Sequence, residues 1–193
     1  MLIIQHRVNT LTKLKQVPSL YGVEVDIRDI DGHLCLQHDP FKRGEALEDF
    51  LKAYRHSFIV LNVKTDGIEA EVLRLVKKYS INHFFLLDLA NPTLVKMTQN
   101  GMTDAAVRFS EFEPIESCLA FAGKAKWVWV DCFTQLPLNQ DTYSQLKRHF
   151  KICLVSPELQ SHPSEQIRQF KKILAPFEID AVCTDYPNLW LNN

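Results

Sequence analysis

The chain alternates between short apolar runs and stretches with helical spacing, and this rhythm constrains its fold more than any other feature. Apolar residues in the intervening stretches recur at i, i+3 and i+4, as in residues 46–54 and 68–79. Strands that alternate with helices predict βαβ units and a parallel sheet. The eight apolar runs are Leu2–Gln5, Gly22–Ile27, Phe58–Val63, His83–Leu87, Ala105–Phe109, Trp127–Asp131, Lys151–Val155 and Asp180–Cys183.

Eight strand–helix units are the number that closes a (β/α)8 TIM barrel, so we predict an α/β fold of this class. The chain has 193 residues and no linker-like segment, which predicts a compact barrel that forms one domain over residues 1–193. An open doubly wound sheet is the alternative. Its usual nucleotide signatures, GxGxxG and GxxxxGK[ST], are absent from the sequence.

Composition excludes several classes of protein. The 22 basic and 23 acidic residues give a net charge of −1, which leaves no basic excess for binding nucleic acid. No apolar run approaches the roughly 18 residues that a membrane span needs. The N-terminal apolar stretch stops at His6, too early for a signal peptide. The five cysteines lack CxxC spacing, so we expect reduced core residues in a cytoplasmic protein. The oligomeric state is left open.

One strand carries two carboxylates on a single face. In residues 22–27 the side chains alternate, so Glu24 and Asp26 point one way while valine and isoleucine point the other way. Two adjacent carboxylates repel each other, but together they suit a hard divalent cation. The alternative is a solvated edge strand with an acidic outer face.

Other predicted strands also end in polar residues. His6 and Arg7 follow the first strand, and His38 follows an extra extended segment at residues 34–37. Asn62 and Lys64 share a face near the end of the strand at residues 58–63. A single histidine at a strand end is more often structural. Several polar strand ends on one barrel rim, however, supply proton transfer, cation binding and anion binding, which metal-assisted phosphoester chemistry requires.

These motifs, in this order, resemble the glycerophosphodiester phosphodiesterase family, within the phospholipase-C-like phosphodiesterase barrels. The motifs are His6-Arg7, Glu24-x-Asp26, His38-Asp39 after an Asp31-Gly32 turn, Asn62-x-Lys64, and the tail Thr184-Asp185-Tyr186-Pro187.

The resemblance implies a TIM barrel that hydrolyses a small-molecule glycerophosphodiester to an alcohol and glycerol 3-phosphate with a divalent cation, Mg²⁺ or Ca²⁺. Each motif residue then takes a role. His6 and His38 would be the general base and acid, Glu24, Asp26 and Asn62 would face the cation, and Arg7 and Lys64 would hold the phosphate.

The sequence departs from the family pattern at three places. Val8 stands where the family has glycine, and only residues 40–45 follow the His-Asp motif before the next helix. Asn62 stands where the family has a glutamate. A neutral amide predicts weaker cation binding unless Glu111, Asp88 or Asp131 compensates.

Two further residues are candidates for substrate binding. Arg108 and Trp129 lie near the ends of two later strands, where they suit a polar pocket with an aromatic wall for a polyol or sugar group. Core packing is the alternative for the tryptophan. Three functions therefore stay open: a metal-assisted phosphodiester hydrolase, a metal-independent phospholipase-C-like phosphodiesterase or lyase, and a barrel that binds a phosphorylated ligand without turnover.

Overall fold

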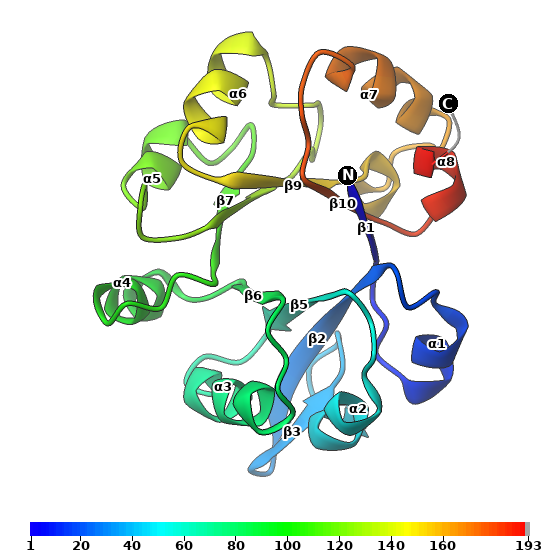
Figure 1. Cartoon of the computed structure of the whole chain (residues 1–193), viewed down its shortest axis with the longest axis vertical. Coiled ribbons are helices and arrows are strands. Elements are labelled where there is room, and N and C mark those ends of the chain that lie inside the picture. The colour runs from blue at the N-terminus through cyan, green and yellow to red at the C-terminus, as the bar shows by residue number, and fades with distance from the viewer. Residues whose placement is uncertain (192–193) are drawn as a thin grey trace. The chain divides into compact units, whose positions relative to one another are not determined.

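All eight predicted strands are present in the computed structural model, which describes residues 1–191 (Figure 1). Three of them have the predicted bounds, and the others differ by at most three residues at either end. The eight strands are β1 (Leu2–Gln5), β2 (Gly22–Ile30), β5 (Phe58–Val63), β6 (Phe84–Leu87), β7 (Ala106–Phe109), β8 (Trp127–Val130), β9 (Lys151–Val155) and β10 (Ala181–Thr184).

The chain divides into two compact units. One comprises residues 5–97, and the other comprises residues 1–4 with the part of the chain from residue 98 onward. In the first unit the strands pair in the order β4 (Glu45–Ala46), β3 (His33–Leu36), β2, β5 and β6, and the β2–β5 and β5–β6 pairs are parallel. The prediction of one domain over residues 1–193 stays a prediction.

A β-hairpin extends the sheet of the first unit. β3 (His33–Leu36) runs antiparallel to β2, and the short β4 (Glu45–Ala46) pairs with β3. Asp31 and Gly32 connect β2 to β3 with positive φ angles of 56° and 78°, as a two-residue hairpin turn requires. This pairing lengthens β2 to Ile30, beyond the predicted end at Ile27.

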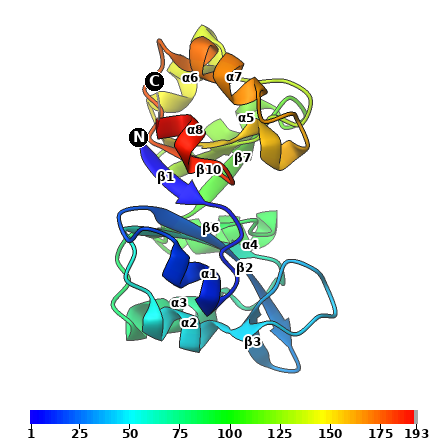
Figure 2. The same cartoon turned by 90° about the vertical axis from the view of Figure 1, so that its right-hand side faces the viewer.

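Helices of the first unit connect its strands. α2 (Leu47–Ala53) and α3 (Glu69–Lys78) contact each other and lie side by side in both views (Figures 1 and 2). Each turns apolar residues inward, for example Phe50 of α2 and Val72 of α3, which are fully buried. The helices are α1 (Leu11–Gln16), α2 (Leu47–Ala53), α3 (Glu69–Lys78) and α4 (Asn91–Gln99), whose last two residues are assigned to the second unit.

In the second unit the strands pair in the order β1-β10-β9-β8-β7, and the pairs from β10 to β7 are parallel. The helix α8 (Pro187–Leu191) was not predicted. It contacts α7 (Gln166–Leu174), beside which it lies in Figure 2. Its Trp190 is buried and donates its indole N–H to the Ser156 hydroxyl at 2.8 Å. The helical elements are α5 (Ile115–Leu119), α6 (Gln140–Lys147), the 3₁₀ helix η1 (Pro157–Gln160), α7 (Gln166–Leu174) and α8 (Pro187–Leu191).

The strands form the core of each unit. Val23, Val25 and Ile27 of β2 have no exposed surface, and β5 and β9 are similarly buried. All five cysteines are free and buried, as predicted. Among residues 1–191, no helix has both the length and the apolar character that crossing a membrane requires.

Candidate active site

Glu24 and Asp26 lie on β2, where they pair with Val60 and Asn62 of β5, and β2 is not an edge strand. Each of the two residues has only 1% of its surface exposed. The alternative interpretation, a solvated acidic face, is therefore wrong. Two carboxylates at this depth require hydrogen-bond donors or a cation, because an uncompensated buried charge is costly.

Three groups of the first unit satisfy part of this requirement. The backbone N–H of Arg7 donates to Glu24 Oε2 at 2.8 Å, and the Asn9 amide donates to Asp26 Oδ2 at 2.8 Å. Asn62 Nδ2 donates to Glu24 Oε1 at 2.9 Å and lies 3.4 Å from Asp26 Oδ1. The Asn62 side chain therefore bridges the two carboxylates through its nitrogen.

The Glu24 carboxyl is electrostatically unfavourable when ionised. Burial raises its pKa above the ordinary value of 4.5, and the Asp26 charge raises it further, while His6 and the Asn62 hydrogen bond act in the opposite direction. A carboxyl whose pKa is higher in the folded chain opposes folding once it ionises. Stability is therefore expected to fall as the pH rises through that pKa.

We predict that Glu24→Gln stabilises the cation-free protein. The substitution removes a buried charge beside Asp26, and we expect a gain on the order of 1 kcal/mol near neutral pH. Thermal unfolding measures the effect. The gain should vanish below about pH 4, where glutamate is protonated in both the folded and unfolded states. The matched control is Glu48→Gln, because hydrogen bonding to Lys78 lowers the pKa of that exposed carboxyl and its loss should not stabilise. A destabilised Glu24→Gln protein would contradict the prediction.

His38 lies between a guanidinium and a carboxylate. Arg7 Nη2 is 2.7 Å from His38 Nε2, and His38 Nδ1 is 3.1 Å from Asp39 Oδ1. A guanidinium only donates hydrogen bonds, so Nε2 accepts and the ring proton lies on Nδ1, directed at Asp39. Hydrogen bonds from Lys42 and His38 lower the pKa of Asp39 to about 2, which keeps it ionised as the partner of this ring.

Lys64 extends from the residue after β5 toward two carboxylates. Its ammonium is 2.7 Å from Asp88 Oδ2 and 3.7 Å from Asp26 Oδ1. Asp88 follows β6 directly, and Lys64 follows β5, so both side chains come from the carboxyl ends of neighbouring parallel strands. The side chain of Lys64 is 20% exposed, which leaves its ammonium group accessible to a ligand.

The sequence interpretation missed two residues of this cluster. Asn9 binds Asp26 twice, because its Oδ1 also accepts the Asp26 backbone N–H at 2.9 Å. Arg28 donates to the His38 carbonyl at 3.0 and 2.7 Å and to the Lys64 carbonyl at 3.1 Å. A signal for Arg28 was present, because it continues the i, i+2 series of Glu24 and Asp26 along β2.

Arg28 is therefore a positioning residue for two candidate site residues. We predict that Arg28→Gln lowers kcat by about tenfold and costs about 1–3 kcal/mol of stability, because hydrogen bonds from a charged donor to partly buried carbonyls are lost. Steady-state kinetics and urea unfolding measure the two effects. Arg74→Gln is the control, since Arg74 pairs only with exposed Glu71 in the described structure. Unchanged kcat in Arg28→Gln would contradict the positioning role.

Arg108 and Trp129 belong to the second unit. The Arg108 guanidinium pairs with buried Asp131 and lies 3.5 Å from Glu113. Trp129 is buried with 6% of its surface exposed. Asp131 also accepts a hydrogen bond from Gln160 at 2.8 Å. The predicted substrate-binding roles of Arg108 and Trp129 stay predictions.

The tail motif anchors the end of β10. Thr184 Oγ1 donates to Glu158 Oε1 at 2.5 Å, and the Asp185 backbone N–H donates to the same oxygen at 3.0 Å. Of the acids considered as compensation for Asn62, Glu111 accepts hydrogen bonds from Thr134. Asp88 joins the cluster of the first unit through Lys64.

The side chains present fit a divalent cation in part. Within residues 1–191, no group of three or more His, Cys, Asp or Glu is arranged to hold a metal. The site offers two buried carboxylates and Asn62, whose buried Oδ1 has no hydrogen-bond partner. Rotation of the amide would exchange its nitrogen for this unpartnered oxygen, and oxygen is the ligand that Mg²⁺ and Ca²⁺ prefer.

Structural comparison identifies the fold as the α/β TIM barrel, which confirms the predicted fold class. Two similar structures come from Agrobacterium tumefaciens. One is assigned as a glycerophosphoryl diester phosphodiesterase, with a TM-score of 0.71 and 16% identity over 97% of this chain and 94% of that chain. The other is a glycerophosphodiester phosphodiesterase, with a TM-score of 0.66 and 14% identity over 98% and 97% of the two chains.

A third structure is a glycerophosphoryl diester phosphodiesterase from Parabacteroides distasonis. Its TM-score is 0.64, with 13% identity over 95% of this chain and 82% of that chain. No family model matches the chain, and no curated protein sequence matches it. At these identities the likeness establishes the fold.

Proposed function

We propose that the chain is a metal-assisted phosphodiester hydrolase that acts on a glycerophosphodiester or a similar sugar or polyol phosphodiester. The observation that carries the proposal is the gathering of acid–base, cation-binding and anion-binding side chains around β2. Arg7, Glu24 and Asn62 are linked by hydrogen bonds, and Lys64 and His38 are joined to the same cluster through Asp26 and Arg7. Three solved structures with this fold are named as glycerophosphodiester or glycerophosphoryl diester phosphodiesterases.

In this proposal Arg7 and Lys64 bind the phosphate. Both cations are held in the free protein by groups that a phosphate can replace, His38 for Arg7 and Asp88 for Lys64. Charge-assisted hydrogen bonds to phosphate are stronger than a hydrogen bond to a neutral ring. Substrate binding would therefore draw Arg7 away from His38 Nε2.

The release of Nε2 makes His38 available as an acid. Asp39 accepts the hydrogen bond from Nδ1–H and orients the ring, so that Nε2, after taking a proton from solvent, would deliver it to the leaving alkoxide. His6 would remove the proton from the attacking hydroxyl, which forms the new bond to phosphorus as the ester bond breaks. The electrostatic effect of His6 lowers the pKa of Glu24, which is consistent with a position of His6 close to the two carboxylates.

Glu24, Asp26 and Asn62 are the residues that would hold the cation. A bound Mg²⁺ or Ca²⁺ would neutralise a phosphate oxygen and lower the pKa of the attacking hydroxyl. The unpartnered Asn62 Oδ1 and the raised Glu24 pKa support a cation here. A positive charge would stabilise both the free acceptor oxygen and the ionised Glu24 carboxylate.

A specific observation favours a second candidate, a metal-independent phosphodiesterase or lyase. Asn62 Nδ2 donates to Glu24 and approaches Asp26, so the chain bridges its two carboxylates without a cation. In that case Arg7 and Lys64 alone would stabilise the charge on the phosphate.

One assay tests the proposal and separates the candidates. The purified protein is incubated with a glycerophosphodiester, and release of the alcohol and glycerol 3-phosphate is measured before and after chelation. Activity that a chelator abolishes and Mg²⁺ or Ca²⁺ restores supports the first candidate. Activity that survives chelation supports the second. The absence of turnover under both conditions would contradict a hydrolase and favour a barrel that only binds its ligand.

A further inference from the structure

Asp88 is an accessible acidic residue beside a cation that is proposed to bind phosphate. It follows the last residue of β6 directly, and its carboxylate accepts a hydrogen bond from Lys64 Nζ at 2.7 Å. The same ammonium lies 3.7 Å from Asp26 Oδ1. Lys64 therefore faces two carboxylates, one of them buried and the other accessible, since 22% of the Asp88 side chain is exposed.

The two proposed phosphate-binding cations differ in the group that a ligand must displace. Arg7 Nη2 lies 2.7 Å from His38 Nε2, and a neutral ring leaves no charge behind when a phosphate takes its place. Lys64 is held by a carboxylate. Asp88 stays next to Lys64 after that displacement, because the parallel pairing of β5 with β6 holds the carboxyl ends of the two strands together. A phosphate that binds Lys64 therefore also lies beside a negative charge.

This negative charge distinguishes phosphate esters by their own charge. The Coulomb energy is proportional to the product of the charges, so Asp88 opposes a dianion about twice as strongly as a monoanion. A phosphodiester is a monoanion, whereas a phosphomonoester is close to a dianion above its second pKa of about 6. The proposed hydrolysis converts the first kind of ester into the second, because breaking one ester bond leaves a phosphate oxygen that can ionise.

We infer that Asp88 makes this site select the singly charged diester over the doubly charged monoester, and thereby promotes release of the product. The inference rests on the proposed function, because it takes Lys64 as a phosphate ligand. Asp88 is then a specificity-determining residue, which keeps Lys64 from holding the product tightly. The alternative is an ordinary ion pair that only holds Lys64 in place.

The experiment compares two ligands that differ in charge but hardly in shape. Glycerol 3-phosphate is a dianion at about pH 8. In glycerol 3-methylphosphonate a methyl group replaces one phosphate oxygen, which leaves a monoanion. Calorimetry measures the Kd of each ligand for the full chain, as wild type and as Asp88→Asn, first in chelator and then in excess Mg²⁺.

We expect Asp88→Asn to tighten binding of glycerol 3-phosphate at least about tenfold more than binding of the methylphosphonate, because the amide removes the repulsion and still accepts a hydrogen bond from Lys64. The inhibition constant of glycerol 3-phosphate in the hydrolysis assay should fall by a similar factor. Equal changes for both ligands, a larger gain for the monoanion, or no change would overturn the inference. A failure of the proposed function would look different, since neither ligand would bind to the wild type or the variant.

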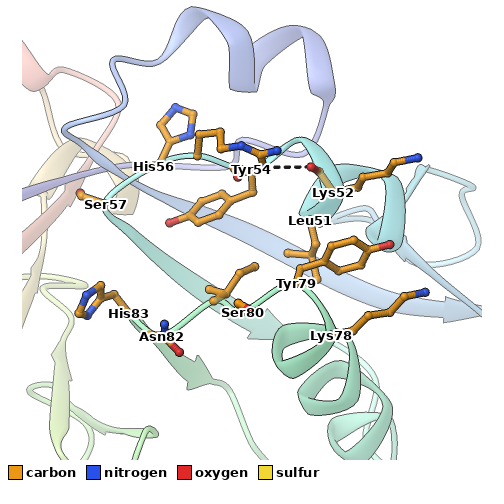
Figure 3. A pocket seen from close by; sticks show the side chains of 12 residues that line it. Leu51, Lys52, Tyr54, His56, Ser57, Lys78, Tyr79, Ser80, Asn82 and His83 are labelled. Carbon is orange, nitrogen blue, oxygen red and sulfur yellow. Dashed lines mark hydrogen bonds between the residues drawn. The ribbon is translucent and has the colours of Figure 1, made fainter.

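Two controls assign the effect to the carboxyl end of β5. Asp49→Asn makes the same charge change at an exposed position of α2 and should leave the ratio of the two Kd values unchanged. A pocket before the first residue of β5 is lined by Lys52, Arg55 and Lys78, and these cations also attract anions (Figure 3). The Lys52→Gln, Arg55→Gln double variant should nevertheless bind both ligands as the wild type does. Loss of binding in that double variant would place the anion at the opposite end of the strand and overturn the inference.

Discussion

His38→Ala should lower kcat for a glycerophosphodiester by about 10²-fold or more, because the leaving alkoxide then departs without a proton donor. The Asp39 partner and the Arg7 contact both orient this ring, so the loss should appear in kcat rather than in stability. His6→Ala should have an effect of similar size through the attacking hydroxyl. Steady-state hydrolysis of a diester with a poor leaving group measures both effects.

The choice of substrate and control makes this test selective. A nitrophenyl ester needs little help from an acid, so the His38→Ala defect should shrink with that substrate while the His6→Ala defect persists. His33 is exposed at the start of β3 and takes no part in the proposal, so His33→Ala is the matched control. Hydrolysis of a poor-leaving-group diester by His38→Ala at the wild-type rate would refute the acid role.

Asn62→Glu should tighten binding of Mg²⁺ or Ca²⁺ by tenfold or more. It places a third carboxylate where Asn62 now contacts Glu24 and Asp26. A unit charge about 4 Å from an ion contributes on the order of 4 kcal/mol at an effective dielectric of 20, and desolvation offsets part of this gain. Calorimetry with the cation-free protein measures the change in Kd.

Asn62→Gln is the matched control, since it adds the same side-chain length without the charge. It should not tighten cation binding. The cation-free Asn62→Glu protein should also be less stable than the wild type, because three buried carboxylates then repel one another. Weaker cation binding in Asn62→Glu would mean that Asn62 does not face a cation.

The strands could be predicted closely because their signal is local. Apolar β-branched runs such as residues 58–63 and 151–155 are identified by composition alone, and both have the predicted bounds. The helix α8 could not be predicted in this way. It has five residues, and the burial of Trp190 and its contact with Ser156, far away in sequence, stabilise it.

Part of the candidate site could be predicted for a related reason. Alternation along β2 placed Glu24 and Asp26 on one face, and their burial agrees with that placement. The hydrogen bonds from Asn9 and Arg28 depend on how loops return to the strand, which periodicity does not encode. The orientation of the Asn62 amide, with its nitrogen toward Glu24, likewise depends on side chains of the neighbouring strand β2.

Cation dependence of hydrolysis shows whether Glu24 and Asp26 hold a catalytic metal ion. Wild type, Glu24→Gln and Asp26→Asn are assayed with one glycerophosphodiester while Mg²⁺ or Ca²⁺ is titrated into chelator-treated protein. We predict that wild-type turnover rises from near zero to saturation with added cation, and that both variants need far more cation or stay inactive. Wild-type turnover that is absent at every cation concentration, or that is the same in all three proteins, would contradict it.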